Sequence, residues 1–184
     1  MLKKVYKWLR RNIYKFLLTN LNKFFNYPNI DAIKRLPVET SIGLIDIGAA
    51  GEIEPRWKPY CNFIKYFGFE PDKRSNQFSI KDKEKFVNYK IFTKALSDSE
   101  KEQDFYFCKK PEVSSLYRPN SNFLKNFPNH ERFQIVEKQI LKTVTLDSLN
   151  LFDNDFIKID VQGGELKILK GSTKTLENIM GLEI

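Results

Sequence analysis

The sequence predicts an α/β protein built around a mainly parallel sheet, and three observations lead to this prediction. From residue 42 onwards, short apolar runs alternate with turns and helical stretches, as in a parallel sheet with crossover connections. A turn of very small residues directly follows the first run, at residues 48–51. The second run ends in an acid, Glu70, about twenty residues after that turn, a spacing typical of sheets that bind a nucleoside.

Length and composition indicate one globular domain preceded by a basic segment. A chain of 184 residues can bury a single sizeable core, and 41% hydrophobic with 29% charged residues is the balance of a soluble globular protein. Residues 1–25 carry seven Lys or Arg and no acid, which leaves 24 of the 31 bases against 23 acids elsewhere. Because the body is nearly neutral, we expect no nucleic-acid partner despite the net charge of +8.

The first 40 residues are predicted to form a helix and a linker, ahead of a domain at residues 41–184. Apolar residues recur at intervals of three and four over 2–25 with bases between them, which predicts an amphipathic helix, and Pro28 and Pro37 mark 26–40 as a linker. No apolar stretch suits a membrane span or an export signal, so we expect a cytoplasmic protein. Two interpretations of the basic helix stay open: packing on the domain or a second subunit, and peripheral contact with an anionic membrane surface.

Five apolar runs have the character of buried parallel strands. They are predicted at residues 43–47, 63–69, 89–95 and 156–159, with a fifth beginning near Met180. Between the third and the fourth, two β-like stretches at 103–108 and 133–144 flank a polar loop at 109–129. We expect this insertion to determine substrate specificity.

The first strand and its turn are the expected cofactor contact. Asp46 lies near the end of the strand, and the small residues Gly48, Ala49 and Gly51 let the backbone approach a ligand closely. A dinucleotide-binding fold is the competing interpretation, because its GxGxxG fingerprint also follows a first strand. Aligned on Gly48, that pattern requires a glycine or an alanine where this sequence has the bulky Ile53, which disfavours it.

Polar and small residues also follow the second, third and fourth strands. The carboxylate of Glu70 is placed to accept hydrogen bonds from ribose hydroxyls, and Ala95 and Leu96 to lie beside an adenine ring. Asp160 follows the fourth strand, where a general base, a cofactor-orienting acid and a helix cap are all compatible with it. A helical run then extends to Gly171.

The cysteines and the histidine do not indicate a metal site. Cys61 and Cys108 are far apart and fit no CxxC or Cys/His spacing, and His130 is the only histidine. Both cysteines are therefore interpreted as buried thiols that pack as small hydrophobic residues.

Six motifs follow one another along residues 42–184. They are residues 46–52, Phe69-Glu70-Pro71-Asp72, Ala95-Leu96-Ser97-Asp98, Val113-Ser114-Ser115-Leu116, Thr145-Leu146-Asp147-Ser148-Leu149 and residues 157–171. In this order and spacing, they resemble the FkbM-type methyltransferases. The resemblance implies a Rossmann-like class I methyltransferase sheet that uses S-adenosylmethionine, usually to methylate a hydroxyl oxygen of a sugar, a glycan or another small molecule. It also implies that Asp46, Gly48 and Gly51 line the methionine and ribose side, Glu70 the ribose, and Ala95 and Leu96 the adenine.

Two departures from the family pattern are visible. Gln162 stands where the family often has a glutamate, and the sequence ends just as the fifth strand should form, which predicts a C-terminally incomplete domain. Two alternative functions stay open beside an O-methyltransferase. One is a nicotinamide-dependent oxidoreductase, and the other is a truncated, non-catalytic protein associated with a membrane surface.

Methyl transfer from a sulfonium is an in-line displacement, so the protein needs mainly to position the acceptor and to remove a proton. Asp160 is the first candidate for that base, or for holding the cofactor amine, and His130 is the alternative base. Ser114 and Ser115 are candidates to hydrogen-bond the substrate, although they fit a purely structural role in the loop equally well.

Overall fold

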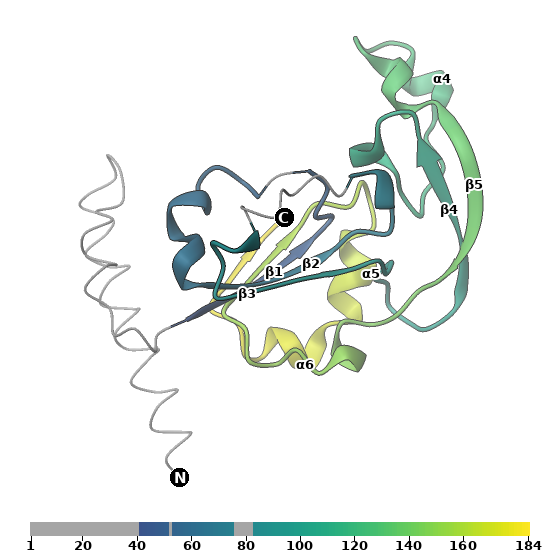
Figure 1. The fold of residues 1–184 in the computed structure, drawn as a ribbon. Helices are drawn as coiled ribbons and strands as arrows, with labels where there is room; N and C mark the ends of the chain where they lie inside the picture. The colour runs from purple at the N-terminus through teal and green to yellow at the C-terminus, as the bar shows by residue number, and fades with distance from the viewer. Residues whose placement is uncertain (1–40, 52, 76–82) are drawn as a thin grey trace. The chain divides into compact units, whose positions relative to one another are not determined.

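The computed structural model describes residues 41–51, 53–75 and 83–184, which form an α/β domain on a five-stranded, fully parallel sheet (Figure 1). The strand order is β3-β2-β1-β6-β7. The strands are β1 (Ile42–Ile47), β2 (Ile64–Phe69), β3 (Asn88–Phe92), β6 (Phe156–Ile159) and β7 (Gly181–Glu183). The predicted α/β class and the five parallel strands are thereby confirmed.

The order of the strands places a cleft at one end of β1. The chain runs from β1 through β2 to β3 on one side, then returns to pair β6 and β7 on the other side of β1. Strand order reverses at β1, and in open parallel sheets ligands bind at the carboxyl ends of the strands where this happens. The loops after β1, β2 and β6 are therefore the ones that meet at a candidate site.

Both faces of the sheet are covered at β1, and β1 is therefore buried along its whole length. Successive side chains of a strand point to opposite faces, so Leu44 packs in one apolar cluster and Ile45 and Ile47 in the other. Tyr66 of β2 shares the cluster of Leu44, whereas Ile168 shares that of Ile45. A strand buried on both sides reads as a continuous apolar run, which is why residues 42–47 were recognisable in the sequence.

The helices in the described part of the chain are short. The α-helices are α4 (Ser121–Leu124), α5 (Glu165–Lys170) and α6 (Thr173–Leu176). The 3-10 helices are η1 (Lys58–Phe63), η2 (Lys73–Ser75), η3 (Pro111–Val113), η4 (His130–Phe133) and η5 (Asp147–Leu149). The helical run predicted up to Gly171 corresponds to α5.

Asp147 explains why the fifth sequence motif contains an acid. Its carboxylate accepts hydrogen bonds from the amides of Lys174 and Thr175, and from the hydroxyls of Thr173 and Thr175. Burial acts to raise the pKa of Asp147, but these hydrogen bonds outweigh it and hold the pKa below its usual value. This residue satisfies the first turn of α6, so its role is structural.

The insertion between β3 and β6 forms an antiparallel hairpin beside the sheet (Figure 1). Its strands are β4 (Glu102–Cys108) and β5 (Ile135–Lys142), and α4 lies near its far end. Both β-like stretches of the insertion were predicted, although the second is shorter than expected. The third sheet strand also ends earlier than predicted, at Phe92, because Ala95 and Ser97 hydrogen-bond to Val144 instead of continuing along β2.

Both cysteines are buried thiols, as predicted. Cys61 is buried in the cluster of Leu44 and Tyr66, and Cys108 is fully buried at the end of β4.

The predicted helix over residues 2–25, the linker over 26–40 and the predicted membrane contact lie outside the described residues. Within the three described ranges, no helix has the length and hydropathy that crossing a bilayer requires.

Candidate functional site

The small-residue turn after β1 is held against the end of β2 by its backbone. The amides of Gly48 and Ala49 both donate to the carbonyl of Phe69, at 2.9 and 3.1 Å. Gly48 has a φ of 83°, and a Cβ atom there would lie 1.8 Å from the carbonyl oxygen of Asp160. Only glycine can therefore occupy this position.

A hollow opens at the carboxyl ends of β1, β2 and β6, where the reversal of strand order predicts a ligand. Seven of the residues predicted from the sequence line it: Gly48, Glu70, Ala95, Leu96, Ser114, Ser115 and Asp160. The glycine turn and the acid at the end of β2 thus face one shared space. The sequence prediction depended on this arrangement above all others.

Three predicted cofactor contacts do not line the hollow. Asp46 is directed to the opposite face of the sheet, where its carboxylate accepts from the hydroxyl of Tyr66 at 2.8 Å and pairs with Nζ of Lys158 at 3.1 Å. Ala49 packs in the core, and the amide of Gly51 donates to the carbonyl of Ser75. A direct cofactor contact of these three residues stays a prediction; in the structure they shape the turn and its support.

Glu70 is a buried carboxyl group that lines the hollow, and no cation among the described residues pairs with it. It is 5% exposed, and its Oε1 accepts from the amide of Asp72 at 2.7 Å. Burial raises the pKa of Glu70 from its ordinary 4.5 to about 8, and the nearby acids Asp72, Asp46 and Glu112 add to this, whereas the Asp72 amide opposes it. Burial therefore favours the neutral, protonated form of Glu70 near neutral pH.

Part of the lining of the hollow is apolar. Ala95 and Leu96 are 5% and 4% exposed, and Phe105 of the hairpin and Ile168 of α5 also line the hollow. These apolar side chains can pack against a flat aromatic base.

Asp160 leaves β6 next to the glycine turn. Its amide donates to the carbonyl of Ile47 at 2.8 Å, and its side chain is exposed along the hollow. The helix-cap interpretation is wrong, because Gly164 occupies the N-cap of α5 and Glu165 accepts from the amide of Gly163. A base and a cofactor-orienting acid are the two roles that stay open.

The structure adds residues that the sequence did not indicate. Lys94, Phe105, Glu112 and Leu116 also line the hollow. Lys94 was recognisable in principle, because it directly precedes the predicted adenine contacts. The other three come from the insertion, whose strands were predicted but whose docking beside the sheet is not visible in the sequence.

His130 lies elsewhere. It lines a separate hollow beside α4, together with Lys125 and Phe133, and not the hollow that contains Asp160. The structure therefore gives no support to His130 as an alternative base. Among the described residues, no group of three or more His, Cys, Asp or Glu is arranged to hold a metal ion.

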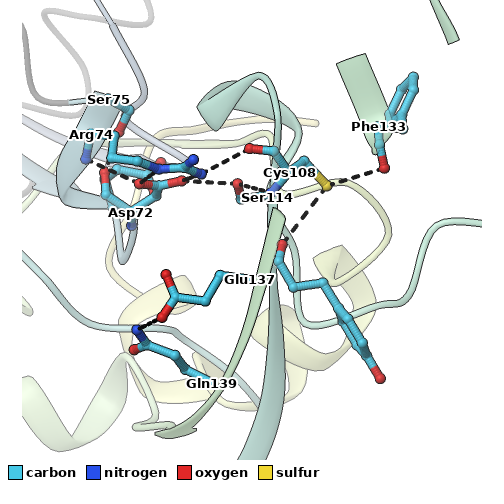
Figure 2. Close-up of polar contacts among 10 residues, drawn as sticks. Asp72, Arg74, Ser75, Cys108, Ser114, Phe133, Glu137 and Gln139 are labelled. Atoms are coloured by element: carbon cyan, nitrogen blue, oxygen red, sulfur yellow. Dashed lines mark hydrogen bonds and ion pairs between the residues drawn. The ribbon is translucent and has the colours of Figure 1, made fainter. Parts of the chain in front are cut away.

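The two predicted substrate residues already have protein partners. The hydroxyl of Ser114 donates to Asp72 at 3.0 Å and accepts from the amide of Cys108 (Figure 2). The hydroxyl of Ser115 lies 3.1 Å from the carbonyl of Gln162 and accepts from the amide of Tyr117. Their side chains connect the hairpin to the loops after β2 and β6, and a substrate contact of the two serines stays a prediction.

The comparisons with known proteins agree with this geometry. The model of the methyltransferase FkbM domain matches residues 46–184, which include every strand from β2 onwards and the turn after β1. No curated protein and no solved structure matches the chain significantly. A family match over most of the sequence, together with a parallel sheet that brings the glycine turn and Glu70 into one hollow, shows that the chain belongs to the FkbM methyltransferase family.

Proposed function

We propose that the protein transfers a methyl group from S-adenosylmethionine to a hydroxyl oxygen of a sugar, a glycan or another small molecule. The observation that carries this proposal is the shared hollow of the glycine turn and Glu70, at the reversal of strand order in a member of a methyltransferase family.

The hollow suits each part of that cofactor. Ionised Glu70 can accept hydrogen bonds from both ribose hydroxyls, and the wall formed by Ala95 and Leu96 can contact the adenine ring. The backbone of the turn at Gly48 lines the hollow, where the methionine part can contact it. Glu112 and Asp160 accompany Lys94 in the lining, and ionisation of Glu70 on binding adds a further negative charge, which favours a ligand with sulfonium and ammonium charges.

When bound, the cofactor supplies a methyl group activated by the positive sulfur. The residues of the chain then have to hold an acceptor hydroxyl in line behind that methyl carbon, and such positioning supplies much of the rate enhancement. Asp160 lies at the strand end where the acceptor would approach, and its carboxylate can take the hydroxyl proton as the oxygen attacks. In the second role left open, the same carboxylate holds the cofactor ammonium group.

Calorimetric titration with S-adenosylmethionine and, separately, with NAD tests the cofactor class. We expect binding of S-adenosylmethionine only. A dinucleotide-binding turn requires a small residue at the position of Ile53. Ile53 is instead a bulky residue, 4% exposed, in the core cluster of Ala49 and Tyr66. Binding of NAD would favour the oxidoreductase alternative, and binding of neither would favour a non-catalytic protein.

Replacing Asp160 by Asn separates its two roles. As the base, Asp160→Asn should lower turnover by roughly 100-fold or more and leave cofactor affinity within about twofold. As the cofactor-orienting acid, it should weaken binding instead. Asp153→Asn is a matched control, because Asp153 is exposed just before the opposite end of β6. Unchanged turnover and affinity in Asp160→Asn would refute both roles.

A further inference from the structure

The loop after β2 is organised around one buried carboxylate, that of Asp72. Asp72 is fully buried, and Nε and Nη2 of Arg74 donate to its two oxygens at 2.9 and 2.5 Å (Figure 2). Burial alone would raise the pKa of Asp72, but the hydrogen bonds from Arg74 and Ser114 lower it below its usual value. The carboxylate is therefore ionised and has its charge compensated inside the protein.

Asp72 connects the two cofactor loops through its backbone. Its amide donates to Glu70, which fixes the carboxylate that faces the hollow. Its carbonyl accepts from the amide and hydroxyl of Ser75, whose own carbonyl accepts from the amide of Gly51 in the turn after β1. A displacement of Asp72 would thus reach both the predicted ribose contact and the glycine turn.

The hairpin is attached to this loop by side-chain hydrogen bonds. Ser114 donates to the carboxylate of Asp72, and Arg74 donates from Nη2 to the carbonyl of Cys108 at 2.9 Å. The guanidinium of Arg74 also lies over the ring of Phe107, 5.6 Å from its centroid. The end of β4 and the segment after η3 are in this way fastened to the β2 side of the cleft.

The next residue fastens the hairpin to the other side. Ser114 has extended backbone angles, so the side chains of Ser114 and Ser115 point in opposite directions. The hydroxyl of Ser115 lies within 3.3 Å of the carbonyls of Val161 and Gln162, in the loop after β6. Two consecutive hydroxyl groups therefore span the cleft above β1, one on each flank.

We infer that Ser114 and Ser115 are positioning residues that hold the hairpin across the cleft, and that Ser114, through Asp72, also fixes the carboxylate of Glu70. The second part rests on the proposed function, because it concerns the group assigned to the ribose. The acceptor side of the site, formed by the hairpin, and the cofactor side are accordingly one coupled unit.

Hydrogen exchange of the unliganded full chain tests the attachment without any ligand. Ser114→Ala should speed exchange by about tenfold at Gly51 and Asp72 as well as at Cys108, because one broken hydrogen bond releases both loops. Ser115→Ala should instead speed exchange over residues 160–164. Lys138→Gln is the control, since it removes the exposed pair with Asp104 on the same hairpin and should affect β4 and β5 alone. Faster exchange confined to the hairpin in Ser114→Ala would overturn the inference.

Binding of S-adenosylhomocysteine between pH 6.5 and 9 tests the effect on Glu70. Ser114→Ala should weaken binding about tenfold and move the midpoint of its pH dependence upwards, because the Asp72 amide is one of the contacts that lower the pKa of Glu70. Ser114→Thr keeps the hydroxyl and should restore both values. Weaker binding with an unmoved midpoint would reveal a purely structural role and overturn the inference. Failure of the unmodified protein to bind would count against the proposed function, and the exchange result would then decide the inference alone.

Discussion

Two acids lie at the ends of the neighbouring strands β1 and β2, and their surroundings differ in one respect. Asp46 and Glu70 are almost equally buried, at 4% and 5% exposure. Asp46 has a cation and a phenol as partners, Lys158 and Tyr66, whereas Glu70 has one backbone amide and acidic neighbours. The comparison teaches that two equally buried acids at neighbouring strand ends can have opposite surroundings. Among the described residues Glu70 has no cation as a partner, and it is the one of the two acids that lines the hollow.

Removing Lys158, the cation beside Asp46, should have the largest effect on stability. Lys158→Met leaves Asp46 buried with only Tyr66 as a partner, and we expect the free energy of unfolding to fall by about 3 kcal/mol. Urea denaturation measures this change. Affinity for S-adenosylhomocysteine, corrected for the folded fraction, should stay within about twofold, and a large loss would place Asp46 in the cofactor site after all.

Replacing Glu70, the acid at the end of β2, should instead raise the free energy of unfolding at high pH. Glu70→Gln removes the predicted ribose acceptor and should weaken S-adenosylhomocysteine binding by about 30-fold. The folded-state pKa of about 8 lies above the ordinary 4.5, so folding favours the protonated form and the native protein loses stability as the pH rises between these values. Glutamine does not titrate, so the variant should be more stable than the native protein by about 1–3 kcal/mol at pH 9, with a much smaller difference at pH 4.5.

Urea denaturation at the two pH values measures that difference. A variant of Asp72 cannot serve as the control for Glu70→Gln, because Asp72 supports the same loop. Asp153→Asn changes an exposed acid and should show no pH-dependent gain in the free energy of unfolding. If Glu70→Gln were destabilising at pH 9, the charge of Glu70 would be compensated in the folded protein, and the contrast with Asp46 would disappear.

The smallest expected effect is the release of protons when the cofactor binds. Donors from a ribose favour the ionised form of Glu70, so cofactor binding at pH 7 should release a fraction of one proton. Calorimetry in buffers of different ionisation enthalpy measures this number, and Glu70→Gln should abolish it. A release that persists in the variant would belong to another group.

The sheet and the acid of its second strand were predictable because they obey local rules. Buried parallel strands read as apolar runs, and the interval between a small-residue turn and the next strand end is set by one crossover. The same rules did not indicate that the side chain of Asp46 lies outside the lining of the hollow. When both faces of a strand are buried, the sequence carries no alternation that distinguishes them.

The hairpin contributions could not be predicted for a different reason. Glu112 and Phe105 reach the hollow through the docking of the insertion, which depends on contacts such as Ser114 with Asp72 across 42 positions of sequence. The motif containing the two serines was visible, but nothing local distinguished a hydroxyl that binds substrate from one that binds the protein. Only the partners in the folded chain make that distinction.

The close approach of Gly48 to the carbonyl of Asp160 sets the distance between the turn after β1 and the loop after β6. Both loops line the hollow, so a side chain at position 48 would displace them from one another even with every polar group retained. Under the proposed function, attempts to change the acceptor should therefore start at the hairpin and leave Gly48 as a glycine.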